Sequence, residues 1–184
     1  NINIKYNTKM MSYNTKNKKI VSIIINDGTI IEADKFINCT GPDNKHILPV
    51  YGMTLIKHVK NNTYHGYLFD NILFQHLHNM DRITFGAECT FDKKDAKIKL
   101  LEKSNKIGFN IHDYDEVYIA ARPLTPDGLP IICRDNDYSN LYHNFGHGFF
   151  GWTLSFISAK ILIDLIENRE NRFIHYLDIN RFHL

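Results

Sequence analysis

The stretch NFGHGFFGWT, residues 144–153, carries the main clue to the fold, because three glycines lie between a predicted strand and a predicted helix. The strand is expected at 140–145. The helix is expected at 148–167, with Leu154, Ile157, Ile161 and Leu165 at core-facing spacing. A helix that begins at such a turn presents unpaired N–H groups at the positive end of its dipole. The stretch therefore predicts a site for an anion or a polar carbonyl group.

Gly146, Gly148 and Gly151 also have the G-x-G-x-x-G spacing of a dinucleotide-binding turn. That fingerprint requires a further strand and an acidic residue about 20 positions later, which holds a ribose hydroxyl. Asp164 and Glu167 fall inside the predicted helix, and no strand is predicted after it. The spacing therefore does not predict a pyrophosphate turn. A simpler alternative stays open, in which the glycines only allow the strand to pack closely on the helix.

The composition is that of a globular protein with one domain or two small ones. The chain has 184 residues, of which 43% are hydrophobic and 23% charged. A net charge of +2 is too small to indicate electrostatic binding of nucleic acid. The longest charge-free apolar run, 149–159, is well short of the roughly 20 residues that cross a bilayer.

Cysteine and histidine spacing disfavours metal and disulfide sites. The three cysteines lie apart, without a C-x-x-C pair, which favours a reducing compartment and hence a cytoplasmic location. The pairs His76/His78 and His143/His147 have no carboxylate partner at a recognised metal spacing. The opening residues lack the features of a signal peptide. There is no initiating Met, and the chain is expected to be a piece of a longer protein.

The rest of the chain predicts mixed secondary structure. The runs 21–25 and 29–31 flank Asn26-Asp27-Gly28 and are expected to form a hairpin. A buried strand is expected to end at Gly41-Pro42. A mostly antiparallel sheet is expected from the segments 64–69, 72–77 and 82–87, and a further strand at 117–121. A helix is expected at 92–105, with Asp92 as its N-cap.

Three segments read together resemble the C-terminal half of FAD-dependent amine-oxidising flavoproteins of the D-amino-acid oxidase type. They are INCTGP (37–42), ARPLTPDGLPII (121–132) and NLYHNFGHGFFGWTLSFISAKILIDLI (140–166). The likeness is greatest to bacterial D-amino-acid dehydrogenase. LPVYGMTL (48–55) and RITFGAE (82–88) are similar to parts of that family's substrate domain.

The resemblance implies an α/β fold with mixed sheets and some α+β character. A partial FAD-binding domain would comprise residues 1–45 and 121–184, interrupted by an antiparallel or mixed-sheet substrate domain at 46–120. The family's N-terminal βαβ unit has no counterpart before Ile20. A partner chain that supplies this unit is therefore one expectation, and association with the surface of the inner membrane is another.

The resemblance also implies site residues. Arg122 would bind the substrate carboxylate, a task that suits a planar fork of donors; alternatively it is a structural arginine that bonds loop carbonyls. N–H groups from Gly148 to Trp152 would face the flavin ring, with His147 contacting it through its backbone. Asp127 is expected only to form a turn. The implied FAD-binding residues are Thr40, Gly41, Gly146, His147, Gly148, Phe149, Phe150, Gly151, Trp152 and Thr153.

Two function classes remain after these observations. The first is an FAD-dependent oxidoreductase that transfers hydride from an amino acid or related amine to the flavin. The second is a non-catalytic remnant or binding subunit that holds no flavin by itself. A hydrolase or phosphate-binding protein has no support, because the chain lacks a nucleophile motif such as G-x-S-x-G.

Overall fold

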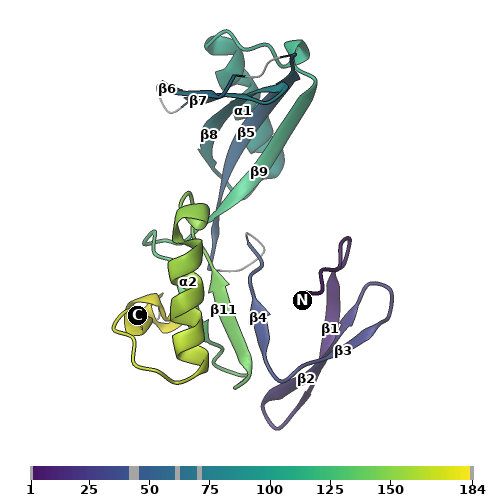
Figure 1. The fold of residues 1–184 in the computed structure, drawn as a ribbon, viewed down its shortest axis with the longest axis vertical. Helices are drawn as coiled ribbons and strands as arrows, with labels where there is room; N and C mark the ends of the chain where they lie inside the picture. The colour runs from purple at the N-terminus through teal and green to yellow at the C-terminus, as the bar shows by residue number, and fades with distance from the viewer. Residues whose placement is uncertain (1, 42–45, 61–62, 70–71, 183–184) are drawn as a thin grey trace. The chain divides into compact units, whose positions relative to one another are not determined.

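The chain forms two compact units, which alternate along the sequence. The computed structural model describes residues 2–41, 46–60, 63–69 and 72–182 (Figure 1). Unit 1 comprises Asn1–Thr40, Leu129–Phe145 and Phe150–Leu184, and unit 2 comprises Gly41–Gly128 and Gly146–Phe149. Several sheets and few helices confirm the expected mixed α/β class. Pro42, the expected end of a strand, lies outside the described residues.

Unit 1 contains two small sheets. In the first, with the order β1-β2-β3, both pairs of neighbours are antiparallel. In the second, with the order β10-β11-β4, β11 is antiparallel to β10 and parallel to β4. The strands are β1 (Met10–Lys16), β2 (Lys19–Ile25), β3 (Ile30–Glu32), β4 (Phe36–Asn38), β10 (Ile131–Arg134) and β11 (Leu141–Phe145).

The expected hairpin is confirmed as β2 and β3. Its turn depends on Gly28, whose φ is +82°, and whose N–H donates to the Ile25 carbonyl at 2.8 Å. β1 was not expected, because the opening residues of the chain are rich in Asn, Lys and Thr. In the structure all residues of β1 are exposed. It pairs with β2 through a tight turn at Asn17 and Lys18, both with positive φ.

The helix α2 (Gly151–Ile166) packs on the second sheet of unit 1 together with the short α3 (Ile174–Leu177). Ile161 is buried as expected, but Ile157 is 48% exposed, so the expected apolar stripe is only partly right. The helix begins at Gly151 rather than Gly148, because Gly146 and Gly148 have positive φ, outside the helical region.

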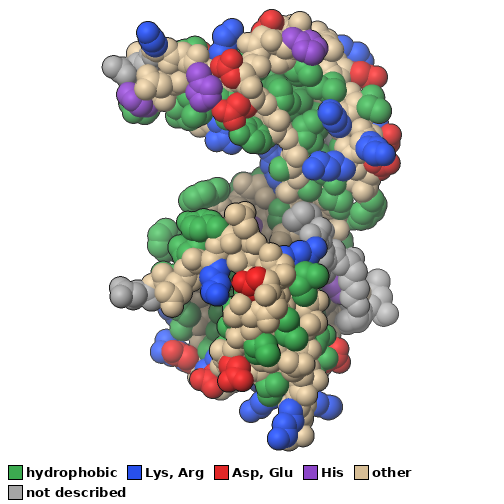
Figure 2. All heavy atoms as spheres, turned by 90° about the vertical axis from the view of Figure 1, so that its right-hand side faces the viewer, with side chains coloured by type: hydrophobic (Ala, Val, Ile, Leu, Met, Phe, Trp, Pro, Cys, Tyr) green, Lys and Arg blue, Asp and Glu red, His purple; other side chains and the backbone are tan. Residues whose placement is uncertain are grey.

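Apolar side chains reach the surface among the charged ones (Figure 2). On α2, Trp152 and Phe156 are 95% and 91% exposed. They are four residues apart and therefore share one side of the helix. The buried residues Ile161 and Leu162 belong to the core that α2 forms with β10 and β11. Helix α2 is thus apolar on more than its core-facing side.

Unit 2 is built on one antiparallel sheet of the order β6-β7-β8-β5-β9. Helix α1 (Lys93–Lys106) contacts β5 and β8, and the expected N-cap is confirmed, because the Asp92 carboxylate accepts from the N–H groups of Lys94 and Asp95. The strands are β5 (Leu48–His58), β6 (His65–Phe69), β7 (Ile72–Leu77), β8 (Met80–Cys89) and β9 (Glu116–Leu124).

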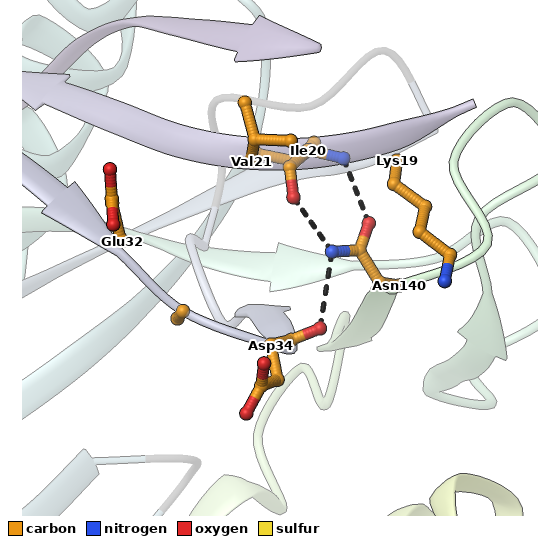
Figure 3. A pocket seen from close by; sticks show the side chains of 7 residues that line it. Lys19, Ile20, Val21, Glu32, Asp34 and Asn140 are labelled. Carbon is orange, nitrogen blue, oxygen red and sulfur yellow. Dashed lines mark hydrogen bonds between the residues drawn. The ribbon is translucent and has the colours of Figure 1, made fainter. Parts of the chain in front are cut away.

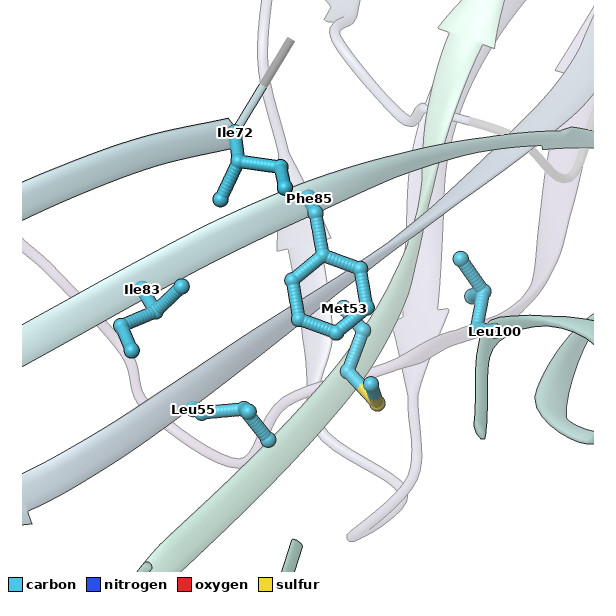
Figure 4. Close-up of a cluster of buried hydrophobic side chains, with 6 residues drawn as sticks. All are labelled: Met53, Leu55, Ile72, Ile83, Phe85 and Leu100. Carbon is cyan, nitrogen blue, oxygen red and sulfur yellow. The ribbon is translucent and has the colours of Figure 1, made fainter. Parts of the chain in front are cut away.

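The two faces of this sheet differ in character. One face carries the core of unit 2, where Met53, Leu55, Ile83, Phe85 and Ile72 pack with Leu100 of α1 (Figure 4). Because side chains alternate along a strand and directly paired residues share a face, the other face has a separate set of residues. We call this the open face; its residues include Gly52, Thr54, Thr84, Arg82, Tyr118, Ala120 and Arg122.

Candidate functional site

Arg122 lies near the end of β9 on the open face, paired with Val50 of β5. The side chain is half-buried, and its Cζ lies 5.1 Å from the centre of the Phe149 ring, a cation–π contact. No carboxylate in the described part of the chain forms an ion pair with Arg122. A half-buried guanidinium without an anionic partner is costly, which makes it a candidate binder of an external anion.

The glycine turn, residues 146–149, packs against the same end of β9. The N–H of Gly148 donates to the Pro123 carbonyl at 2.8 Å, and His147 forms a β-bridge with Leu124. Gly148 has a φ of +52°, and an added Cβ would lie 2.9 Å from Leu124 Cδ1. Only glycine therefore fits this position without strain. The structure brings Arg122 and the glycine turn together, although they are well separated in sequence.

The bond from Gly148 to Pro123 corrects one expectation. The N–H of Gly148 was expected to face the flavin, but it is used within unit 2. His147 contributes its backbone to the bridge with Leu124, and burial lowers the pKa of its imidazole. A lowered pKa favours the neutral ring near pH 7, so His147 adds no positive charge beside Arg122.

Positive charge on the open face comes from two arginines. Burial, and secondarily the charge of Arg82, lower the pKa of the Arg122 guanidinium. Arginine nevertheless stays protonated in proteins, so Arg122 keeps its charge. Arg82 is exposed and pairs with Ile56 in the register of β5 and β8. Glu116, which is also paired with Ile56, adds one carboxylate to this face. The positive charge nearest Arg122 is therefore its own and that of Arg82, and it suits an anionic ligand.

The first turn of α2 lies in unit 1 and retains free donors. Its N-cap residue is Phe150, which provides no side-chain hydrogen bond. In the described part of the chain, the N–H groups of Gly151, Trp152 and Thr153 donate to no protein acceptor. Such a helix start favours negative charge or carbonyl oxygens.

These donors fit the flavin part of FAD. The isoalloxazine ring presents carbonyl oxygens that such N–H groups can bind. Phe150 and Trp152 offer exposed aromatic surface at the same helix end. The residues present are therefore compatible with the flavin that the sequence resemblance implies.

Thr40 and Gly41 follow β4. The N–H and the hydroxyl of Thr40 both donate to Asn38 Oδ1, at 3.0 and 2.6 Å. An added Cβ at Gly41 would meet only Pro123 Cγ, at 3.8 Å, an ordinary contact. Gly41 thus lies beside the strand that carries Arg122, and its local contacts do not require a glycine.

Neither Gly52 nor Arg82 was expected from the sequence to belong to the site. Gly52 lies within β5, and an ideal Cβ there would lie 2.8 Å from Cζ of Arg122 and closer still to Nη1. A glycine inside a strand pattern is a known signal of close approach and could have drawn attention to this position. Arg82 has no comparable signal, because an exposed arginine on a strand is common.

A concave region lies in unit 1, lined by the start of β2, the end of β3 and the two residues after it, and Asn140, which precedes β11 (Figure 3). The Asn140 side chain accepts from the Ile20 N–H at 2.9 Å and donates to the carbonyls of Ile20 and Asp34 at 2.8 and 3.2 Å. Because the amide is fully used by backbone groups, this region is best explained as a structural junction.

Two further features are absent from the described residues. No helix within the described ranges has both the length and the apolar character needed to span a bilayer. Among the same residues, no three His, Cys, Asp or Glu side chains are grouped so as to hold a metal ion.

Comparison with known families and sequences gives a consistent result. A family model described as FAD dependent oxidoreductase (DAO) matches residues 1–165. A D-amino acid dehydrogenase of Agrobacterium fabrum is 52% identical over 62 residues, which are 33% of this chain and 15% of the relative. A D-amino acid dehydrogenase of Vibrio cholerae is 52% identical over 50 residues, 27% of this chain and 12% of the relative.

Solved structures share the fold. Glycine oxidase from Bacillus cereus superposes with a TM-score of 0.64 at 19% identity, over 91% of this chain and 52% of that protein. Glycine oxidase from Geobacillus kaustophilus gives a TM-score of 0.67 at 18% identity, over 96% of this chain and 52% of that protein. The chain thus spans about half the length of these structures, and at this identity the likeness concerns the fold alone.

Proposed function

Since this chain belongs to the FAD dependent oxidoreductase (DAO) family, we propose that it takes part in the FAD-dependent oxidation of a D-amino acid or a related amine, with Arg122 holding the substrate carboxylate. The relatives named D-amino acid dehydrogenase support this substrate class. The observation that carries the proposal is the half-buried Arg122 guanidinium, which has no anionic partner among the described residues.

The chemistry of Arg122 suits this role. A guanidinium and a carboxylate form two parallel N–H···O bonds, which fix the orientation of the bound molecule as well as its position. The Phe149 ring lies against the guanidinium, and the cation–π contact favours this position of the side chain. A substrate bound in this way would have its α-carbon at a fixed distance from the sheet, so that orientation lowers the barrier to reaction.

FAD, when bound, supplies the acceptor for the α-hydrogen and its electron pair. The chain's own contribution at that end would be the N–H groups of Gly151, Trp152 and Thr153, which stabilise negative charge without reorganisation. The amine nitrogen must lose a proton as the C=N bond forms. We assign no residue of this chain to that proton transfer.

Replacement of Arg122 tests the proposal. The chain is purified and incubated with FAD, and flavin absorbance is measured after removal of free flavin. Oxidation of D-alanine and of D-alaninamide, which lacks the carboxylate, is then followed with an artificial electron acceptor. We expect Arg122→Gln to lower kcat/KM for D-alanine by roughly 100-fold or more, and to change that for D-alaninamide little.

Two results would contradict the proposal. Protein that retains no flavin would favour a binding subunit without cofactor. Equal losses with D-alanine and D-alaninamide would show that Arg122 supports the fold rather than the carboxylate. Arg122→Lys is a useful additional variant, because it keeps the charge but loses the planar fork and should recover only part of the activity.

A further inference from the structure

Gly52 occupies an unfavourable place for a glycine. It lies in the middle of β5, between Tyr51 and Met53, and it is buried. Glycine in a strand interior costs stability, because it contributes no side-chain packing and loses more backbone entropy than other residues. A positive φ does not explain its presence, since Gly52 is not among the residues with positive φ. The pairing of β5 with β8 shifts register between Tyr51 and Gly52, and a glycine often accompanies such an irregularity. The close approach of another group is a further feature that calls for the missing side chain.

The group that approaches Gly52 is the guanidinium of Arg122. An ideal Cβ at Gly52 would lie 2.8 Å from both Cζ and Nη2 of Arg122, and nearer still to Nη1. Real Cβ atoms essentially never approach other atoms so closely, so even an alanine would displace the guanidinium. The side chain of Arg122 thus lies across the backbone of β5 at Gly52.

The residues paired with Gly52 on the neighbouring strands have no side chain or a small one. Gly52 is paired with Ala120 on β9 and with Gly86 on β8. This cross-strand row therefore carries nothing larger than a methyl group. On one side, Val50 and Arg122 form the next row; on the other side, Thr54 is paired with Tyr118 and Thr84. The guanidinium lies over this row of small residues, and its Cζ is 5.1 Å from the centre of the Phe149 ring.

We propose that Gly52 is the positioning residue of the carboxylate site: its lack of a side chain lets Arg122 lie across β5 with its donors directed to a substrate carboxylate. This rests on the proposed function of Arg122. Gly52 itself makes no polar contact with the substrate. A methyl group at position 52 would force Arg122 into another rotamer and separate its fork from the place where the carboxylate binds.

Gly52→Ala tests this idea, with Gly66→Ala as the matched control. Gly66 belongs to the same sheet, and an added Cβ there would meet only the Phe74 carbonyl oxygen, at 3.8 Å. Both variants change one strand glycine to alanine, and neither glycine has a positive φ. The urea midpoint of each variant is measured first, so that a loss of folding is separated from a loss of binding.

The first readout is independent of substrate and cofactor. In the 184-residue chain, the Nε–Hε signal of Arg122 and its nuclear Overhauser effect to the Phe149 ring report the position of the guanidinium. We expect Gly52→Ala to shift the signal and abolish the contact, and Gly66→Ala to leave both unchanged. An unchanged signal in folded Gly52→Ala would overturn the proposal whatever Arg122 binds.

The second readout is binding of D-alanine and D-alaninamide by titration. We expect Gly52→Ala to weaken D-alanine binding by roughly tenfold or more and to leave D-alaninamide binding unchanged. In the Arg122→Gln background, Gly52→Ala should cause no further loss, because two changes that act through one group are not additive. A full additional loss there would show that Gly52 acts by another route.

These outcomes separate the two proposals. If Arg122→Gln weakens D-alanine binding but Gly52→Ala does not, the role of Gly52 is wrong and the role of Arg122 stands. If Arg122→Gln leaves D-alanine binding unchanged, the proposed function of Arg122 fails, and with it the role of Gly52 in carboxylate binding. The magnetic-resonance result still decides whether the position of the guanidinium depends on the missing side chain at Gly52.

Discussion

The backbone N–H of Gly148 donates to the carbonyl of Pro123 at 2.8 Å, and this bond ties the glycine turn to the strand that carries Arg122. Pro123 lies next to Arg122 in β9, and Phe149, next to Gly148, contacts the Arg122 guanidinium. The turn and the arginine therefore form one local structure within unit 2. Two of the segments that carry the family resemblance meet at this point.

Gly148→Ala should destabilise this structure. Alanine disfavours a φ of +52°, and its Cβ would lie 2.9 Å from Leu124 Cδ1. We expect the free energy of unfolding to fall by about 1–3 kcal/mol, measured by urea denaturation. Gly66→Ala is the control, because its added methyl group meets nothing nearer than 3.8 Å. Equal midpoints for the two variants would show that the turn tolerates a side chain.

Asn140→Ala should destabilise unit 1. The Asn140 side chain is buried and makes three hydrogen bonds to the backbone of Ile20 and Asp34 (Figure 3). Alanine would leave these backbone groups unsatisfied, at a cost of about 2–4 kcal/mol in the free energy of unfolding. Asn136→Ala is the control, because Asn136 is exposed and, among the described residues, its side chain bonds that of Asn180 alone. A cost similar to that of Asn136→Ala would refute the structural role of Asn140.

Asp164 should make stability depend on pH in the acid range. Hydrogen bonds from Lys160 and Asn171 lower the pKa of its carboxyl group in the folded protein. A carboxyl whose pKa is lower when folded contributes stability above its unfolded pKa of about 3.9, and this contribution is lost as the pH falls through the folded pKa. The charged form is therefore the stabilising one.

We accordingly expect Asp164→Asn to be less stable than the unmodified chain near pH 7. The difference should shrink as the pH falls from 5 toward 2. Urea denaturation at a series of pH values measures it. Glu170→Gln removes an exposed carboxylate and serves as the control. A difference between Asp164→Asn and the unmodified chain that stays constant over this range would show that the charge of Asp164 is not involved.

Arg82 should strengthen the attraction of an anionic substrate to the open face. We expect Arg82→Gln to weaken D-alanine binding by roughly two- to fivefold at low ionic strength, and to reduce the dependence of binding on salt. Lys57→Gln is the control, because it removes the same charge from an exposed residue of β5 on the opposite face of the sheet. If the two variants behave alike, only the net charge of the protein matters.

Local sequence signals predicted much of the secondary structure. The N-cap of α1 at Asp92 follows from interactions within a few residues, and so does the turn at Gly28. The extent of β9 does not follow from such local interactions. A strand was expected to stop before Arg122 and Pro123, but β9 continues to Leu124. It lies at the edge of its sheet, where a proline that lacks an N–H is tolerated, and only the strand order reveals this.

The sequence by itself determined the family likeness and the strand-glycine-helix pattern, and through that likeness it led to the prediction that Arg122 binds a carboxylate. These depend on residue types at fixed spacings, which are visible along the chain. Only the tertiary structure decided that Gly148 donates its N–H to Pro123, and that the guanidinium of Arg122 lies over Gly52. The reason is physical: strand pairing and side-chain packing join residues that are distant in sequence, and no local pattern encodes which of them meet.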